Sequence, residues 1–214
     1  DEMLSALERV DPDTLNGKTE WITHAYLLQS LKSSVAQRIC RTELWNVNQM
    51  GGWHSGFSQI AQLQPVGTDE LRQQSTSRWA KLGPFIDQEI KNLEYGLELG
   101  YSAPKPVVQR VIDQVDGLLA LEIEQSPFYS PANRDENEAF VTATHAIVTD
   151  QIYPALQRYR DYLAGPYLER ARSELAVTAN PDGLACYDAS LQAYTTLDRS
   201  GKEVFELGKL TVAA

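Results

Sequence analysis

The segment GPFIDQEIKNLEYGLELG, residues 83–100, shows most clearly how the chain folds. Its apolar residues recur at steps of three and four, which is the spacing of one face of an α-helix: Ile86, Ile90, Leu93 and Leu97. Pro84 suits the first position of a helix, and Gly100 suits the residue just past its end. We therefore predict a helix that begins at Pro84 and ends at Gly100.

The same periodicity continues on both sides of this segment. We predict further helices over residues 18–44, 57–63, 68–82, 107–119, 135–163, 167–175, 187–194 and 200–208. Thr68 can cap one of these helices, and Pro154 is expected to kink another. Strand signals are nearly absent, although the closing residues 209–214 look like the start of a strand or turn. The predicted fold class is therefore all-α, an irregular multi-helix array of long and short helices with little or no β structure.

The length of 214 residues, with 43% apolar and 22% charged residues, is typical of a globular protein. We predict a single helical domain over residues 1–214. Neither end looks like a natural terminus, because the chain starts in a helical pattern without a signal peptide and closes on a short apolar run. We therefore expect this domain to be a fragment of a longer protein.

The charge of the chain limits its partners. There are 19 Lys and Arg residues against 29 Asp and Glu residues, which gives a formal net charge of −10. Nucleic-acid affinity comes largely from basic side chains that neutralise phosphates, so we expect no nucleic acid as a partner. No apolar run is long enough for a transmembrane helix, so we expect no membrane span.

Metal-ligating residues are few and scattered. The histidines are His24, His54 and His145, and no two of them are four residues apart, as a His-Glu-x-x-His zinc motif requires. Cys40 and Cys186 are too few for a disulfide framework or a cysteine zinc site. We interpret Cys186 as a buried structural residue rather than a reactive thiol. The sequence predicts no metal site in this chain.

Signals for nucleophilic catalysis or phosphate binding are also weak. Ser55 follows His54 in an apparent loop, but the glycines of a nucleophile elbow are not at the required positions. We expect this loop to anchor Trp53 in the core. Gly96 and Gly100 lie at a helix end rather than after a strand, so they favour close packing of helices over phosphate binding. We assign no catalytic residue.

Three segments are richer in Gly, Pro, Asn and aromatic residues than helix connections require: residues 45–57, 92–106 and 181–187. Loops of this composition can line a cleft, and they are equally common as packed connectors. The cleft candidates are Asn92, Tyr95, Tyr101 and Tyr187. The alternative for each is a hydrogen-bonded structural side chain at a helix end.

Several motifs occur in an order that resembles one bacterial family. They are NLEYGLELGYSAPKPVV at 92–108, SPF at 126–128, PALQRY at 154–159, PDGLACY at 181–187, YTT at 194–196 and EVFELG at 203–208. The family is the domain of unknown function numbered eight-eight-five, many of whose members are described as putative lipoproteins. The resemblance covers most of the chain.

The resemblance implies a metallopeptidase context. Full-length members are considerably longer and resemble helical zinc peptidases of the gluzincin kind, with a His-Glu-x-x-His helix in a half that would follow residue 214. The resemblance therefore implies zinc in that missing C-terminal half and none in this chain. It also implies that the missing half is a partner of this chain, that a peptide is the substrate, and that the protein resides in the bacterial cell envelope or periplasm.

Two functions are compatible with these features. The first is a helical scaffold portion of an uncharacterised bacterial zinc-metallopeptidase-like protein, which lacks the zinc site and is not catalytic alone. Such a portion would expose the surface that packs on the missing half, and it could form a homodimer through that surface. The second is a self-contained helical module that binds a peptide or a protein.

Overall fold

In a computed structural model, which describes residues 1–213, the chain is helical, and the predicted all-α class is confirmed. The described residues contain one isolated β-bridge, between Pro104 and Arg172. The chain divides into two compact units: unit 1 comprises residues 1–42 and 176–213, and unit 2 comprises residues 43–175. The single domain expected over residues 1–214 stays a prediction. None of the described helices combines the length and the apolar composition needed to cross a bilayer.

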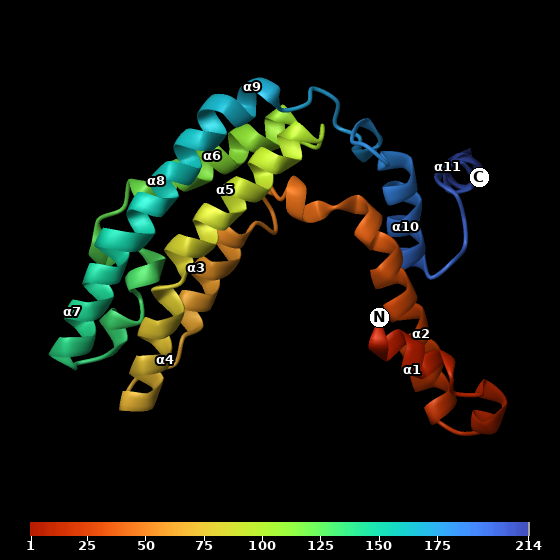
Figure 1. Ribbon diagram of the computed structural model, residues 1–214, viewed down its shortest axis with the longest axis horizontal. Coiled ribbons are helices and arrows are strands. Elements are labelled where there is room, and N and C mark those ends of the chain that lie inside the picture. The colour runs from red at the N-terminus through yellow and green to blue at the C-terminus, as the bar shows by residue number, and fades with distance from the viewer. Residues whose placement is uncertain (214) are drawn as a thin grey trace. The chain divides into compact units, whose positions relative to one another are not determined.

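Unit 2 is built around three helices that lie side by side. Its helices are α3 (Trp53–Leu63), α4 (Asp69–Trp79), α5 (Leu82–Glu98), α6 (Lys105–Leu119), α7 (Glu138–Ile147), α8 (Tyr153–Tyr162) and α9 (Leu168–Arg170). Figure 1 shows α8 packed along both α5 and α6, while α4 packs on α7. Short 3-10 and π-helical turns make most of the connections.

Helix α5 confirms the helix predicted from the segment at 83–100. Ile86 and Leu93 on its apolar face are 0% and 1% exposed. Past its last turn, Gly100 has a φ of +85°, which favours glycine. The N–H of Tyr101 then donates to the carbonyl of Gly96 at 2.8 Å. This pattern is a Schellman-type helix end, and it explains why the helix stops where the sequence predicts.

Gly96 permits a close contact inside unit 2. A Cβ atom at Gly96 would collide with the backbone carbonyl of Leu44. The close approach expected at this glycine is therefore present. The neighbouring segment is the 3-10 turn Thr42–Leu44 rather than a second long helix.

The helix predicted over residues 135–163 forms an almost continuous rod. α7 runs into a π-helical turn, Val148–Ile152, which leads directly into α8. Pro154 occupies the first turn of α8, where it has no N–H to donate and its ring crowds the turn before it. The widened π turn just before the proline is the expected consequence. Beyond the rod, α9 covers only Leu168–Arg170 instead of the predicted 167–175.

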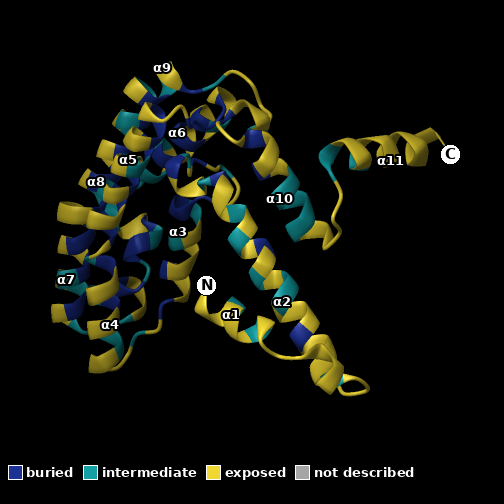
Figure 2. Cartoon of the chain, turned by 45° about the vertical axis from the view of Figure 1, so that its right-hand side comes forward, coloured by how far each residue is buried: buried dark blue, intermediate teal, exposed yellow. Residues whose placement is uncertain are grey.

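The core of unit 2 lies between α5, α6 and α8, where Figure 2 shows the buried residues. The largest fully buried side chains include two tyrosines, Tyr159 and Tyr167, and Phe128. The hydroxyl of Tyr167 accepts a hydrogen bond from the N–H of Ala103 at 2.9 Å. This hydrogen bond offsets the cost of burying the Tyr167 hydroxyl, so the ring packs as a core residue.

Unit 1 combines the two ends of the described chain. Its helices are α1 (Glu2–Glu8), α2 (Glu20–Ala36), α10 (Gly183–Thr195) and α11 (Gly201–Ala213). Both α1 and α10 pack on α2, and Nε2 of His24 lies 3.0 Å from the carbonyl oxygen of Leu7. α11 meets α10 at its first residue, where the N–H of Gly201 donates to Oδ1 of Asp188 at 2.8 Å. No residue of α11 is buried.

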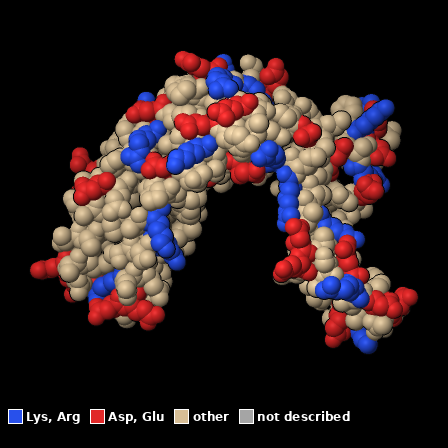
Figure 3. Space-filling model, in the orientation of Figure 1, with Lys and Arg blue, Asp and Glu red and all other residues tan. Residues whose placement is uncertain are grey.

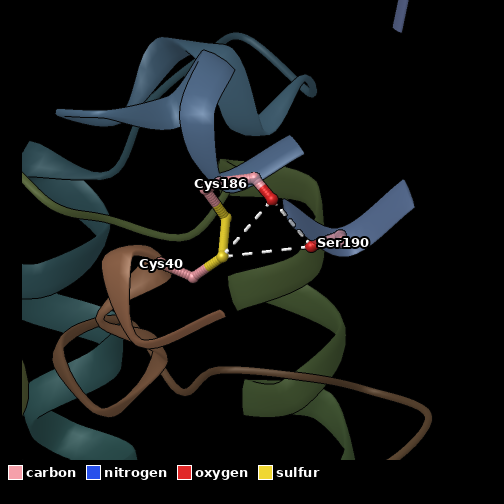
Figure 4. The surroundings of a disulfide bond; sticks show 3 residues. All are labelled: Cys40, Cys186 and Ser190. Atoms are coloured by element: carbon pink, nitrogen blue, oxygen red, sulfur yellow. Dashed lines mark hydrogen bonds between the residues drawn. A yellow bond between two sulfur atoms is a disulfide. The ribbon is translucent and has the colours of Figure 1, made fainter. Parts of the chain in front are cut away.

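A disulfide bond joins Cys40 to Cys186 within unit 1, with a Cα–Cα distance of 4.7 Å. Figure 4 shows that it links the 3-10 turn Gln37–Cys40 to α10, where Oγ of Ser190 donates to the carbonyl of Cys186 at 2.8 Å. Cys186 is 5% exposed, as expected for a structural residue. The sequence interpretation missed its pairing with a cysteine 146 residues away.

Three further local predictions are wrong. Residues 209–213 continue α11 and do not start a strand or turn, because the described chain offers them no strand partner. The segment Trp53–Ser55 is not a loop but the first turn of α3, which begins directly after the extended backbone of Gly52. Residues 37–40 form a 3-10 turn rather than α-helix, and α2 ends at Ala36.

Candidate functional site

A groove of about 770 Å³ opens on unit 2 between α3, α4 and the start of α5. This volume is within the range of sites that hold small molecules or short peptide segments. Its apolar lining consists of Phe57, Ile60, Trp79, Leu82 and Phe85. Its polar lining consists of Gln74, Ser77, Arg78 and Lys81.

The first wall of the groove is α3. Phe57 and Ile60 are three residues apart, so both lie on the same face of this helix. The guanidinium of Arg134 donates to the carbonyls of Ala61 and Gln64 at 3.1 and 2.8 Å. These carbonyls belong to the last turn and the C-cap of α3, where a helix has no backbone partners of its own. The bonds from Arg134 therefore hold the C-terminal end of this wall in place.

The second wall of the groove is α4. Oγ1 of Thr68 accepts the N–H of Leu71 at 3.3 Å, so the predicted cap is confirmed. Nε of Arg72 donates to Oδ2 of Asp135 at 2.9 Å, and the Asp135 side chain is 1% exposed. The hydrogen bond from Arg72 holds the pKa of Asp135 below its ordinary value. This pair fixes α4 to the segment before α7.

Aromatic rings support the floor of the groove. Phe57 and Phe85 pack edge to face with their centroids 5.3 Å apart. Trp53 packs against Phe85 at 5.9 Å and against the buried Tyr159 at 4.9 Å. Such T-shaped pairs are favourable beyond the area they bury. The floor therefore rests on the core of unit 2, and the expected burial of Trp53 is confirmed at 8% exposure.

The groove carries positive charge only. Arg78 and Lys81 line it, and no Asp or Glu residue does. Nη1 of Arg78 donates to Oε1 of the buried Gln64 at 2.8 Å, which orients the guanidinium. On the face drawn in Figure 3, acidic and basic side chains are interspersed. A groove without acids is therefore a local departure from a chain whose net charge is −10.

The four cleft candidates from the sequence do not line this groove. Asn92 and Tyr95 lie on α5, and Tyr101 follows the end of that helix and is 4% exposed. Tyr187 lies on α10 in unit 1, with its side chain exposed and packed beside Gly201. A role in a cleft stays a prediction for each of the four.

Asn92 takes part in a small polar network around a buried carboxylate. Glu89 is 8% exposed, and its Oε2 accepts Nδ2 of Asn46 at 2.9 Å. Nδ2 of Asn92 lies 3.4 Å from Oε1 of the same side chain. A buried carboxylate needs such donors. The network connects the residue 45–57 segment to α5.

The histidines make separate contacts. His54 on α3 is 2% exposed, with Nε2 2.9 Å from Oε1 of Gln114. Burial lowers the pKa of His54, and the hydrogen bond with Gln114 offsets part of that shift. His24 belongs to unit 1, and His145 lies on α7 near Glu124. Within residues 1–213, no group of three or more His, Cys, Asp or Glu side chains could hold a metal ion.

Sequence reasoning missed the groove because its lining residues fit an ordinary core pattern. Phe85 lies one position before Ile86 in the same apolar segment, yet it is 36% exposed. Ile60, within the helix predicted over residues 57–63, is 41% exposed. A possible signal was the spacing of Leu82 and Phe85, which continues at steps of three from the buried Trp79. The groove itself depends on how α3, α4 and α5 are placed in unit 2, which no local pattern encodes.

Comparison with known proteins identifies relatives of the chain. A family model described as "Bacterial protein of unknown function (DUF885)" matches residues 1–214. The chain is also similar to the crystal structure of the putative lipoprotein from Colwellia psychrerythraea, with a TM-score of 0.71 and 21% sequence identity. The similarity covers 79% of this chain and 31% of that chain, so this chain spans less than a third of the lipoprotein. No curated protein matches the chain.

Proposed function

The chain belongs to the bacterial DUF885 family, and on this basis we propose that it is the helical scaffold portion of a zinc-metallopeptidase-like protein. In this proposal the chain is not catalytic alone, and the zinc and its ligands lie in a C-terminal part of the longer protein. The chain supplies a surface on which that part packs, and the peptide substrate binds to the assembled protein. The observation that carries the proposal is the exposed apolar surface of unit 1.

Apolar side chains of α2 and α11 are unusually exposed. On α2, Ile22 and Tyr26 are 64% and 71% exposed, and on α11 Phe205, Leu210 and Val212 are 64%, 71% and 90% exposed. Single exposed apolar residues are ordinary, but several on one short helix indicate an interaction surface. We infer that the C-terminal part of the longer protein covers this surface.

The contacts of the histidines and cysteines support the proposal that zinc lies outside this chain. The three histidines are engaged with Leu7, Gln114 and Glu124 in different parts of the chain. Both cysteines are in the disulfide bond, so neither offers a thiolate. We therefore assign no catalytic step to residues 1–213.

Two observations support a location in the bacterial cell envelope or periplasm. Disulfide bonds form and persist in oxidising compartments such as the periplasm, and Cys40 and Cys186 form one here. A protein with a similar fold is described as a "putative lipoprotein". Both fit a protein that folds outside the reducing cytoplasm.

The first experiment measures metal content and activity of the purified chain. We expect far less than one zinc ion per chain by mass spectrometry after gel filtration, and no hydrolysis of a peptide library. One tightly held zinc ion per chain would contradict the proposal if it disappears on His24→Ala, His54→Ala or His145→Ala. Cys40→Ser with Cys186→Ser is not a suitable control, because it also removes the disulfide bond.

The second experiment tests the exposed surface. We expect the chain to bind a hydrophobic dye and to self-associate at micromolar concentration, through a homodimer that buries α11. The double variant Phe205→Ser, Leu210→Ser should reduce both signals. Its matched control, Lys202→Ser with Glu206→Ser on the same helix, should leave them unchanged. Weak dye binding by the unmodified monomeric chain would contradict the scaffold role.

The second candidate function is a self-contained module that binds a peptide or a protein. The groove of about 770 Å³ on unit 2 favours it, because the groove is formed entirely by residues of this chain. Cooperative two-state unfolding of a monomer without dye binding would support this function over the scaffold.

A further inference from the structure

We propose that the groove between α3, α4 and the start of α5 binds an amphipathic helix that carries acidic residues along one side. This inference names a partner for the second candidate function and depends on that function. It does not depend on the zinc-peptidase relationship. It is carried by the arrangement of apolar and basic side chains along the groove.

One side of the groove is apolar along its length. Phe57 and Ile60 form this side from α3, and Leu82 and Phe85 continue it from α5. Ile60 is 41% and Phe85 36% exposed, so both offer apolar area to a partner. Helical partners commonly dock in such grooves through apolar residues at steps of three and four.

The remaining lining, from α4 and the turn after it, is mainly polar. Gln74, Ser77 and Arg78 are spaced at i, i+3 and i+4, which places them along one face of α4. Lys81 follows two residues past the end of that helix, just before α5. Gln74 and Arg78 alone are roughly 6 Å apart along the helix axis. The polar groups are therefore spread along α4 and its C-terminal end instead of gathering at one point.

This spread of polar groups discriminates between classes of ligand. A fatty acid has one charged end and an apolar body, so it would pair with a polar group at a single end of a groove. An amphipathic helix has an apolar face beside a polar face along its whole length. The groove therefore matches a helix better than it matches a single-chain amphiphile.

The charge of the groove selects an acidic partner. Arg78 and Lys81 line it without any Asp or Glu, in a chain with a net charge of −10. A guanidinium has five N–H donors, and Gln64 takes one of them from Arg78 at 2.8 Å. That bond holds the guanidinium at the groove and leaves other donors for a carboxylate of the partner. Opposite charge across an interface favours the matching partner and opposes a basic one.

The test measures fluorescence anisotropy with three labelled peptides and the whole chain. The acidic peptide carries Leu at steps of three and four and Glu on the adjacent face. The basic peptide replaces every Glu with Lys, and the scrambled peptide keeps the acidic composition without the helical pattern. We expect the acidic peptide to bind at least tenfold more tightly than the other two, with affinity that falls as salt rises.

Matched variants assign the binding to the groove. Arg78→Gln with Lys81→Gln should weaken the acidic peptide roughly tenfold. Lys91→Gln with Arg110→Gln removes two exposed charges elsewhere on unit 2 and should have no effect. Ile60→Glu places a repelling charge on the apolar side at a half-exposed position and should abolish binding. Helical circular dichroism of each variant checks that it folds.

The outcomes separate the inference from the proposed function. If the acidic and basic peptides bind equally and Ile60→Glu blocks both, the peptide-binding function stands and the acidic preference is wrong. If no peptide binds, both are wrong. If decanoate displaces the acidic peptide at one molecule per chain while decanol does not, the groove is a fatty-acid site and the inference is overturned.

Discussion

Units 1 and 2 are both helical, but they bury apolar side chains to very different extents. In unit 2, Ile86, Val111 and Leu156 are completely buried between three long helices. Within residues 1–42 and 176–213, the buried apolar side chains are those of Cys40 and Cys186. Hydrophobic burial is the main stabilising contribution to folding. Unit 2 therefore has a hydrophobic core of its own. Unit 1 depends on the disulfide bond between Cys40 and Cys186 and, in our proposal, on a partner surface that covers it.

Loss of the disulfide bond should produce the largest difference between the units. We expect Cys40→Ser with Cys186→Ser to destabilise unit 1 by about 3–5 kcal/mol, because a long loop is no longer closed in the unfolded chain. Limited proteolysis followed by mass spectrometry should then show cleavage in α2 and α10 while α5 and α8 stay intact. Ser190→Ala, which removes one hydrogen bond beside the same bridge, is the control and should cost about 1 kcal/mol.

A matched pair of isoleucines tests the cores directly. Ile86→Ala in α5 should lower the free energy of unfolding by about 3 kcal/mol, because it leaves a cavity in the core. Ile22→Ala in α2 removes a side chain that is 64% exposed and should change it by less than about 0.5 kcal/mol. Urea unfolding followed by circular dichroism measures both. Equal losses for the two variants would mean that unit 1 has a core of its own.

Two glycines test how closely the helices of unit 2 are packed. Gly96→Ala places a methyl group against the carbonyl of Leu44 and should destabilise the chain by about 1–3 kcal/mol. Gly117→Ala lies in α6 with open space around the added Cβ, so it should be neutral or stabilising by up to about 1 kcal/mol. Thermal unfolding of the two variants should therefore shift in opposite directions. A neutral Gly96→Ala would show that α5 does not contact the turn at Leu44 closely.

The pair of Arg72 and Asp135 should make part of unit 2's stability depend on pH. The hydrogen bond from Arg72 lowers the pKa of Asp135. The ionised carboxylate therefore stabilises the fold at pH values above its ordinary pKa near 3.8. This stabilisation is lost as the pH falls through the lowered pKa. Asp135→Asn should therefore be less stable than the unmodified chain at pH 7, and the difference should shrink toward pH 2. Urea midpoints at several pH values measure it. Asp69→Asn, which alters the exposed partner of Arg72, should have a smaller effect at every pH.

Most of the helices could be predicted because their signals are local. The spacing of Ile86, Leu93 and their neighbours, the cap at Thr68 and the glycine at 100 all act within a few residues. The glycines around Trp53 misled the prediction, because glycine indicates a loop on average while here Gly52 only begins α3. Likewise, the apolar residues 209–214 suggested a strand or turn. A strand needs a partner strand to pair with, and the local sequence does not reveal whether one is present.

The remaining features depend on long-range packing. The disulfide joins residues 146 positions apart, and no spacing rule connects them. The groove depends on which side of Phe85 and Ile60 is left uncovered by other helices. Exposure of an apolar residue is a property of the assembled unit, so sequence periodicity alone does not reveal it.

Hydrogen–deuterium exchange of the oxidised chain, resolved by peptide mass spectrometry, tests the contrast between the units most directly. Amides that open only with global unfolding exchange slowly, and amides in weakly packed helices exchange quickly. We predict slow exchange in α5 and α8 and exchange at least a hundredfold faster across α11, because no residue of that helix is buried. Protection of α11 and α2 equal to that of α5 and α8 in the monomeric chain would contradict the account.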